Sequence, residues 1–123
     1  MTATDLRPTY PDHQHPVVIA TIPQHLVGAG QGVAILVEDV QIAVFRTDDG
    51  CFYALSNRDP FTGANVLARG IVGSRKGIPI VSSPMRKHAF DLSTGQSLDD
   101  PAVRIATFTV HDCGTTLDIG VSQ

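Results

Sequence analysis

The sequence predicts an all-β domain of antiparallel strands in a sandwich or small-barrel arrangement. From residue 17 onward, short runs rich in Val, Ile, Thr and Phe are separated by turn residues. An Asp-Asp-Gly step at residues 48–50 and an Asp-Cys-Gly step at 112–114 stand between such runs, where glycine accepts the positive φ of a tight reversal. No long stretch keeps a helical period, and the segment DLSTGQSLDDP is too polar and too rich in turn residues for a helix.

The expected strands follow one another along the chain, with turns between them. They are residues 17–21 (VVIAT), 32–37 (GVAILV), 41–46 (QIAVFR), 51–55 (CFYAL), 78–82 (IPIVS), 104–111 (RIATFTVH) and 115–120 (TTLDIG). The expected turns are residues 38–39, 48–50, 94–95 and 112–114. Because short hairpin turns join neighbouring strands, consecutive strands are expected to pair antiparallel.

The run at residues 104–111 shows the alternation of a half-covered strand. Thr107 and Thr109 alternate with Phe108 and Val110, and successive side chains of a strand point to opposite faces. One face of this strand can therefore be buried while the other meets water, as in a sandwich or a small barrel.

Length and texture predict a single domain over residues 17–123. Residues 1–16 are polar, hold three prolines and lack an apolar period, so they are expected to form a flexible tail. Cys51 and Cys113 lie far apart in the sequence. Two isolated, reduced thiols are expected from this spacing, rather than a disulfide framework or a metal knuckle.

Charge and hydropathy exclude several classes of partner. The formal net charge is −3, and no run of basic residues marks a surface for nucleic acid or for an anionic membrane. No apolar run reaches the roughly 20 residues of a membrane span, and the first residues lack the layout of a secretory signal. A cytoplasmic protein with a protein or small-molecule partner is therefore expected.

Two long segments depart from the strand-and-turn texture, at residues 57–74 and 82–95. Long loops in a compact β domain usually carry function. Their frame resembles the Rieske domain family, whose first loop reads Cys-x-His followed by glycine and leucine, and whose second reads Cys-x-x-His followed by an aromatic residue and Asp-Leu-x-Thr-Gly. The fitting residues are Asn57, Pro60, Gly63, Ala64 and Leu67, then Pro84, Phe90, Asp91, Leu92, Thr94 and Gly95.

The resemblance extends from about Val17 to Gly120 and implies a Rieske-like [2Fe-2S] domain fold with two long loops at one end. The positions of the four cluster ligands hold Asp59, Phe61, Ser83 and Arg86. A cluster of this type needs two thiolates and two neutral imidazoles. Phenylalanine has no lone pair to give and arginine has donors only, so this chain is expected to bind neither cluster nor metal.

The departures from the Rieske pattern are similar to a second family, the small subunits of assimilatory NAD(P)H-dependent nitrite reductases. The similarity rests on NRDPFTGANVLARGIVG followed by PIVSSPMRKHAFDLSTGQSLDDP. It implies an accessory subunit without catalytic residues or a redox group of its own. It also implies a large-subunit partner that carries FAD, sirohaem and an iron–sulfur cluster and reduces nitrite to ammonium in nitrate assimilation.

Two hypotheses concern the emptied loops. In the first, Asp59 and Arg86 form a charge-assisted hydrogen bond across the gap, and Phe61 fills the space of a lost ligand ring. In the second, the loop tip presents Arg58, Arg86, Lys87 and His88 to an acidic face of the large subunit. For both hypotheses the alternative is that these side chains are solvated on their loops.

Two other functions are open at this level. One is a Rieske-type ferredoxin that carries electrons to an oxygenase, against which the missing ligands argue. The other is a cluster-free Rieske-like interaction module in a different complex. An independent enzyme is not indicated, because the sequence offers no nucleophile elbow and no paired carboxylates in a suitable arrangement.

Overall fold

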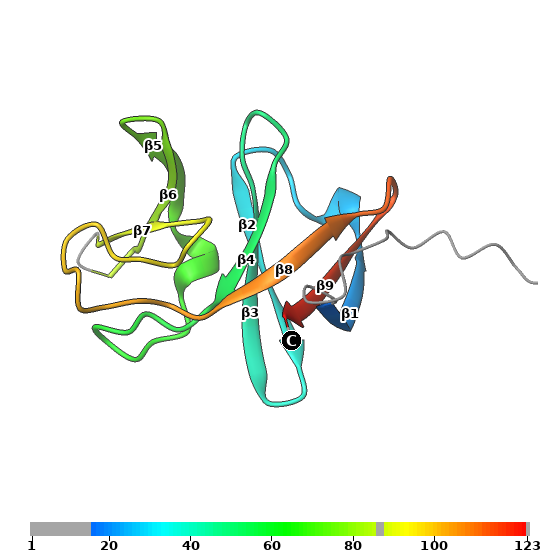
Figure 1. Cartoon of the computed structure of the whole chain (residues 1–123), viewed down its shortest axis with the longest axis horizontal. Coiled ribbons are helices and arrows are strands. Elements are labelled where there is room, and N and C mark those ends of the chain that lie inside the picture. Colours follow the sequence, from blue (N-terminus) through cyan, green and yellow to red (C-terminus); the bar gives the residue numbers. More distant parts are fainter. Residues whose placement is uncertain (1–15, 86–87, 123) are drawn as a thin grey trace, which may run out of the picture.

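The computed structural model describes residues 16–85 and 88–122, and in this part of the chain nearly all regular structure is β-strand (Figure 1). The strands are β1 (Pro16–Pro23), β2 (Gln31–Val37), β3 (Val40–Arg46), β4 (Phe52–Ser56), β5 (Ile71–Arg75), β6 (Ile78–Ser82), β7 (Ala89–Asp91), β8 (Thr107–Asp112) and β9 (Thr116–Ser122). Two single-turn 3-10 helices, η2 (Gln24–Leu26) and η3 (Leu67–Arg69), complete the described elements. The predicted all-β class is confirmed.

Six strands form one antiparallel sheet in the order β1-β9-β8-β4-β3-β2. Figure 1 shows this sheet curling, with β1, β8 and β9 on one side of the β2–β4 group. The concave side encloses a core of seven buried residues, Ile22, Val27, Ile42, Val44, Ala54, Leu117 and Ile119. The sheet is therefore a half-barrel, as the small-barrel expectation required.

A second, three-stranded sheet in the order β5-β6-β7 lies on the opposite side of the β2–β4 group from β1, β8 and β9 (Figure 1). Between the two sheets lies a second core, formed by Ala43, Phe45, Leu55, Leu67, Val81, Phe90, Leu92 and Ile105. Strand β3 serves both cores, because alternate side chains point to opposite faces. Ile42 and Val44 enter the half-barrel, whereas Ala43 and Phe45 enter the second core.

The predicted turns are present. Glu38, Gly50, Gly95 and Gly114 all have positive φ, between 54° and 95°. Gly95 is required for a further reason: a Cβ atom built there would lie 2.1 Å from the carbonyl oxygen of Ile105. The Thr-Gly step of the second loop is thus fixed both by its backbone conformation and by close packing.

Three expectations about elements need correction. Strands β5 and β7 lie inside the two segments expected to be irregular. Strand β5 is mostly exposed and β7 is only three residues long, so neither has the long apolar pattern that predicts a strand. Strand β8 begins at Thr107 rather than at residue 104. Residues 1–15 of the expected tail lie outside the described residues, and Pro16 already belongs to β1.

Candidate functional site

The candidate site is formed by the connection from β4 to β5, residues 57–70, and the connection from β6 to β7, residues 83–88. Asn57 anchors the first connection at both ends. Its buried side chain donates from Nδ2 to Gln41 Oε1 at 2.9 Å, and its Oδ1 accepts the N–H of Ala68 at 2.7 Å. Side-chain bonds to neighbouring elements thus fix a loop that has little regular structure of its own.

The tip of the first connection is a tight turn between Asp59 and Ala64. The N–H of Asp59 donates to the carbonyl of Ala64 at 2.8 Å, and the N–H of Gly63 donates to the carbonyl of Asp59 at 2.7 Å. Gly63 has φ 78°, which favours glycine at this position. Pro60 within this turn is exposed. The turn therefore holds Asp59 at a defined place below an exposed tip.

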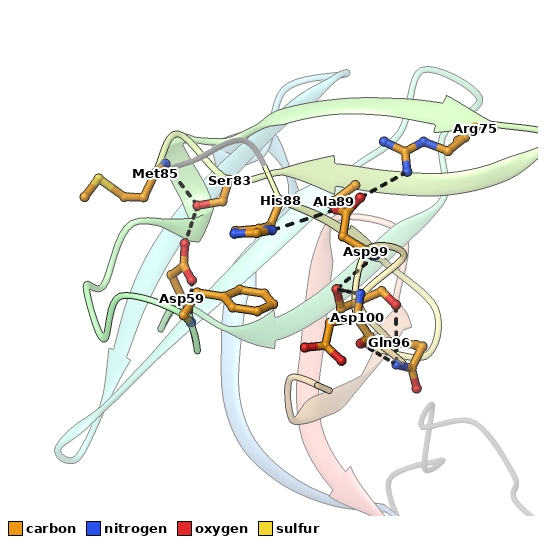
Figure 2. Close-up of polar contacts among 11 residues, drawn as sticks. Asp59, Arg75, Ser83, Met85, His88, Ala89, Gln96, Asp99 and Asp100 are labelled. Atoms are coloured by element: carbon orange, nitrogen blue, oxygen red, sulfur yellow. Dashed lines mark hydrogen bonds and ion pairs between the residues drawn. The ribbon is translucent and has the colours of Figure 1, made fainter. Parts of the chain in front are cut away.

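Asp59 is the centre of the contact between the two connections (Figure 2). Its side chain is 0% exposed and Ser83 is 1% exposed. Oδ1 of Asp59 accepts the N–H of Phe61 at 2.8 Å, and Oδ2 accepts the hydroxyl of Ser83 at 2.6 Å. The Ser83 oxygen in turn accepts the N–H of Met85 at 3.1 Å. We call the Asp59–Ser83 hydrogen bond the loop clasp.

The loop clasp joins two positions at which the Rieske resemblance places cysteines. The hypothesis from the sequence paired Asp59 with Arg86, whereas the partner of Asp59 across the gap in the described residues is Ser83. Arg86, the partner proposed from the sequence, lies outside the described residues, so the Asp59–Arg86 pair stays a prediction. A serine before proline gave no sequence signal for this role, because it depends on the approach of residues 24 positions apart.

Phe61, where the Rieske resemblance places a histidine, lies against two rings, one in the second connection and one in β7. Its ring is stacked on that of His88, with centroids 3.9 Å apart and an interplanar angle of 21°. Its centroid is 6.0 Å from that of Phe90, which belongs to the second core. Aromatic contacts of this kind stabilise by about 0.5–1.5 kcal/mol beyond the buried area.

His88 also lies near a carboxylate, Asp99, whose place at this site the sequence did not indicate. Its Nδ1 lies 4.0 Å from Oδ2 of Asp99, and the same oxygen accepts the N–H of Ala89 at 2.9 Å. The other oxygen of Asp99 lies 3.9 Å from Arg75 at the end of β5. Asp99, in the loop after β7, therefore contacts both Arg75 at the end of β5 and Ala89 at the start of β7 (Figure 2).

The donor set does not fit a Rieske cluster. Asp59 already uses both carboxylate oxygens within the protein, Phe61 offers no lone pair, and the Ser83 hydroxyl donates to Asp59. Across residues 16–85 and 88–122, no three His, Cys, Asp or Glu side chains form a group suited to a metal ion. Cys51 and Cys113 are free and exposed in the turns after β3 and β8, and neither belongs to the two connections.

The predicted partner contacts are only partly described. Arg58 is exposed beside the tip, and its N–H donates to the hydroxyl of Ser56 at 3.3 Å. His88 is partly buried between Phe61 and Asp99. Arg86 and Lys87 lie outside the described residues. A basic tip that contains all four side chains stays a prediction.

The Asp-Leu-x-Thr-Gly motif closes the second loop through Asp91. Burial works against the ionised form of this carboxyl, but the hydroxyl and N–H of Ser93 both donate to Oδ1, at 2.7 and 2.8 Å. The pKa of Asp91 is accordingly held below its usual value of 3.8. The motif is therefore a hydrogen-bonded turn that favours the ionised form of Asp91.

The Rieske-like [2Fe-2S] domain family model matches residues 19–119. Over 70 residues, the chain is 40% identical to the nitrite reductase (NADH) small subunit of Escherichia coli K12. That match spans 56% of this chain and 65% of the relative, which is less than two thirds of its length. A 75-residue match at 43% identity covers 59% of this chain and 8% of the nitrite reductase [NAD(P)H] large subunit of Klebsiella oxytoca.

A solved structure extends this similarity over nearly the whole chain. It is described as an NADH-dependent nitrite reductase small subunit from Mycobacterium tuberculosis and has a TM-score of 0.78 and 37% sequence identity. The match covers 91% of this chain and 97% of that one. Within the described residues, no helix is long and apolar enough to cross a membrane.

Proposed function

The chain belongs to the Rieske-like [2Fe-2S] domain family, among relatives that are nitrite reductase small subunits, and from this premise we propose its function. It serves as the accessory small subunit of a cytoplasmic NAD(P)H-dependent nitrite reductase. It supports the reduction of nitrite to ammonium in nitrate assimilation and holds no catalytic residue and no iron–sulfur cluster of its own.

The observation that carries this proposal is the chemistry of the loop clasp. In a Rieske domain the cluster would tie the two connections together through four ligands. In this chain a buried hydrogen bond between Asp59 and Ser83 ties them, and the ring of Phe61 packs against His88. Contacts between protein groups thus join the two connections. A cluster-free interaction module needs such contacts, whereas in an electron carrier the cluster would join the loops.

The proposed partner is the large subunit of the enzyme, which would carry FAD, sirohaem and an iron–sulfur cluster. The match within the Klebsiella oxytoca large subunit supports this pairing, because a segment similar to this chain is part of that polypeptide. Covalent fusion in one protein favours association of the corresponding separate chains. Arg58, Arg86, Lys87 and His88 are proposed to orient the tip on an acidic surface of that partner, since rim charges mainly set association rate and register.

Co-purification followed by an activity assay tests the proposal. The chain is co-expressed with the nitrite reductase large subunit of its own organism, and nitrite-dependent NAD(P)H oxidation is measured with and without it. We expect a stable complex. We also expect nitrite-dependent NAD(P)H oxidation to be faster, or to be lost more slowly over time, when the chain is present. No complex and no effect on either quantity would refute the accessory role.

The iron content of the isolated chain separates this function from a Rieske-type ferredoxin. We expect a colourless protein with far less than one iron atom per chain, because the described donors at the former ligand positions are engaged or lack lone pairs. Visible absorbance with stoichiometric iron and sulfide would restore the electron-carrier alternative. Binding to a different enzyme instead of nitrite reductase would identify a cluster-free module of another complex.

A further inference from the structure

Strand β5 is the open edge of the small sheet. In the described part of the chain it pairs with β6 on one side and with no strand on the other. Ile71 is 76% exposed, and Gly73 and Ser74 are exposed as well. An exposed edge strand is a template for an added strand unless it is protected. Its backbone groups and the charges around it determine whether β5 can accept a further strand.

The turn after β5 fixes which backbone groups face outward. Lys76 and Gly77 have φ values of 53° and 80°, which identify a two-residue hairpin turn with Arg75 opposite Ile78. The pair that flanks such a turn is hydrogen-bonded. Because hydrogen-bonded and open pairs alternate along an antiparallel ladder, Gly73 also bonds towards β6.

Val72 and Ser74 therefore direct their N–H and C=O groups away from β6. The other side of β6 agrees with this assignment, since Pro79 stands opposite Ser74 and its carbonyl accepts the N–H of Leu92 at 2.9 Å. Among the described residues, no backbone hydrogen bond from a turn or loop involves the outward N–H and C=O groups of Val72 and Ser74. Two donors and two acceptors are thus presented in the spacing that an extended segment needs.

The other edge strands of the two sheets are either protected against pairing with a further strand or uncharged. Strand β1 has a register shift between Val18 and Ala20 and a proline at each end, both of which discourage pairing. The outer side of β7 is occupied, because the N–H of Leu98 donates to the carbonyl of Ala89 at 2.9 Å. Strand β2 has no charged residue that would select a partner.

The stretch of the sequence that contains β5 is basic. Residues 60–90 contain five of the nine Lys and Arg residues and none of the 12 Asp and Glu residues. Arg69, Arg75 and Lys76 flank β5 or end it, and all three are exposed. Arg75 forms an ion pair with Asp99 at 3.9 Å, with both side chains more than 40% exposed, so this pair is weak. A negatively charged segment would be attracted to this strand.

The side of β5 that faces the half-barrel sets a second condition. A cleft of about 450 Å³ lies there, with Val72 and Ser74 on one wall and Asp48 and Asp49 on the other. The hydroxyl of Thr47 donates to Asp49 and lowers the pKa of that carboxyl. Carboxylates on the cleft side would repel acidic side chains that point into the cleft, so the segment must carry its acidic residues on the opposite face.

We infer that β5 is a docking site for an acidic, extended segment of the large subunit, which adds to the small sheet as a fourth strand. The assignment rests on the proposed function for the identity of the partner. Main-chain bonds to Val72 and Ser74 supply affinity, as in other strand additions. Arg69, Arg75 and Lys76 favour an acidic segment. Asp48 and Asp49 determine which face of that segment carries its acidic residues.

Amide hydrogen exchange in the purified complex tests the inference without any substitution. We expect the amides of Val72 and Ser74 to exchange at least about tenfold more slowly in the complex than in the free chain. The amide of Gly73, already bonded to β6, is the internal reference. Equal exchange rates for Val72 and Ser74 in the two states would overturn the inference.

A proline substitution tests the same edge through affinity. Ser74→Pro removes one outward N–H and is tolerated on an edge strand; we expect about tenfold weaker binding to the large subunit. Ser74→Ala keeps the N–H and should bind like the unchanged chain. Thermal unfolding of both variants verifies that each is folded. Wild-type affinity of folded Ser74→Pro would refute strand addition at β5.

Charge reversal and sedimentation distinguish the remaining outcomes. The double change Arg69→Glu and Lys76→Glu should weaken binding severalfold and reduce its salt dependence. A homodimer that Ser74→Pro dissociates would show that a second copy occupies β5, which overturns the inference. Complete absence of binding by the unchanged chain would refute the proposed function itself, whereas binding that Ser74→Pro leaves intact refutes only the role of β5.

Discussion

We expect Ser83→Ala to lower the free energy of unfolding by about 2 kcal/mol, because it removes the hydroxyl that donates to Asp59 at 2.6 Å. The Asp59 carboxylate is 0% exposed, so water cannot readily replace the missing donor. Hydrogen bonds to charged groups contribute about 1.5–3 kcal/mol, and a buried acceptor left unpaired costs about 1–3 kcal/mol. The N–H of Met85 loses its acceptor in the same variant.

The loop clasp is isolated by a double-mutant cycle with Asp59→Ala. Each single change breaks the Asp59–Ser83 bond, so the double variant should be more stable than the sum of the single effects predicts, by about 1–2 kcal/mol. Urea unfolding at pH 7, followed by far-ultraviolet circular dichroism, measures all four free energies. A loss of 2 kcal/mol corresponds to a melting temperature roughly 8 °C lower.

Ser74→Ala is the matched control, because Ser74 is exposed on β5 and its change should stay within about 0.5 kcal/mol. Additive effects of the Asp59 and Ser83 changes, within about 0.3 kcal/mol, would show that the two side chains are not coupled. The loops would then be held by their backbone turns alone, and the role of the loop clasp in joining the two connections would be refuted.

Three further predictions concern neighbouring contacts. Phe61→Ala should cost about 2 kcal/mol in thermal unfolding, since a partly buried ring loses its stack on His88; a loss no larger than that of His88→Ala alone would refute a packing role for the ring. Asp91→Asn should destabilise at pH 7, and the difference should vanish as the pH falls below the lowered pKa of Asp91, because a depressed folded pKa stabilises only while the group is ionised; a constant difference down to that pH would contradict this. Gly95→Ala should cost at least about 2 kcal/mol, because φ is 78° and the new Cβ meets the Ile105 carbonyl; unchanged urea unfolding would contradict the crowding.

The loop frame was predictable from the sequence, but its internal contacts were not. Pro60 and Gly63 mark the first turn because their backbone preferences are local, and the structure gives Gly63 the positive φ that such a turn needs. The partner of Asp59 is a different kind of property. Ser83 and Arg86 lie close together in the sequence, so the sequence allows either as a partner of Asp59. The position of β6 in the fold buries Ser83 against Asp59.

The same distinction applies to the strands. The run QIAVFR predicted a strand because continuous apolar residues suit β3, which has a core on each face. Strand β5 gave a weak signal, since an exposed edge strand needs neither alternation nor a long apolar run. Its place in the fold depends on pairing with β6, which is a contact between segments and leaves little trace in the local pattern.

The sequence by itself determined the all-β class, the turns, the resemblance to Rieske domains and the loss of the cluster ligands. These are set by residue chemistry and by backbone preferences that act over a few positions. Only the tertiary structure decided that Asp59 pairs with Ser83, that Phe61 stacks on His88 and that β5 is an edge strand of the small sheet among the described residues. Each of these depends on which distant segments pack together, because burial in the second core selects among partners that the local sequence leaves equivalent.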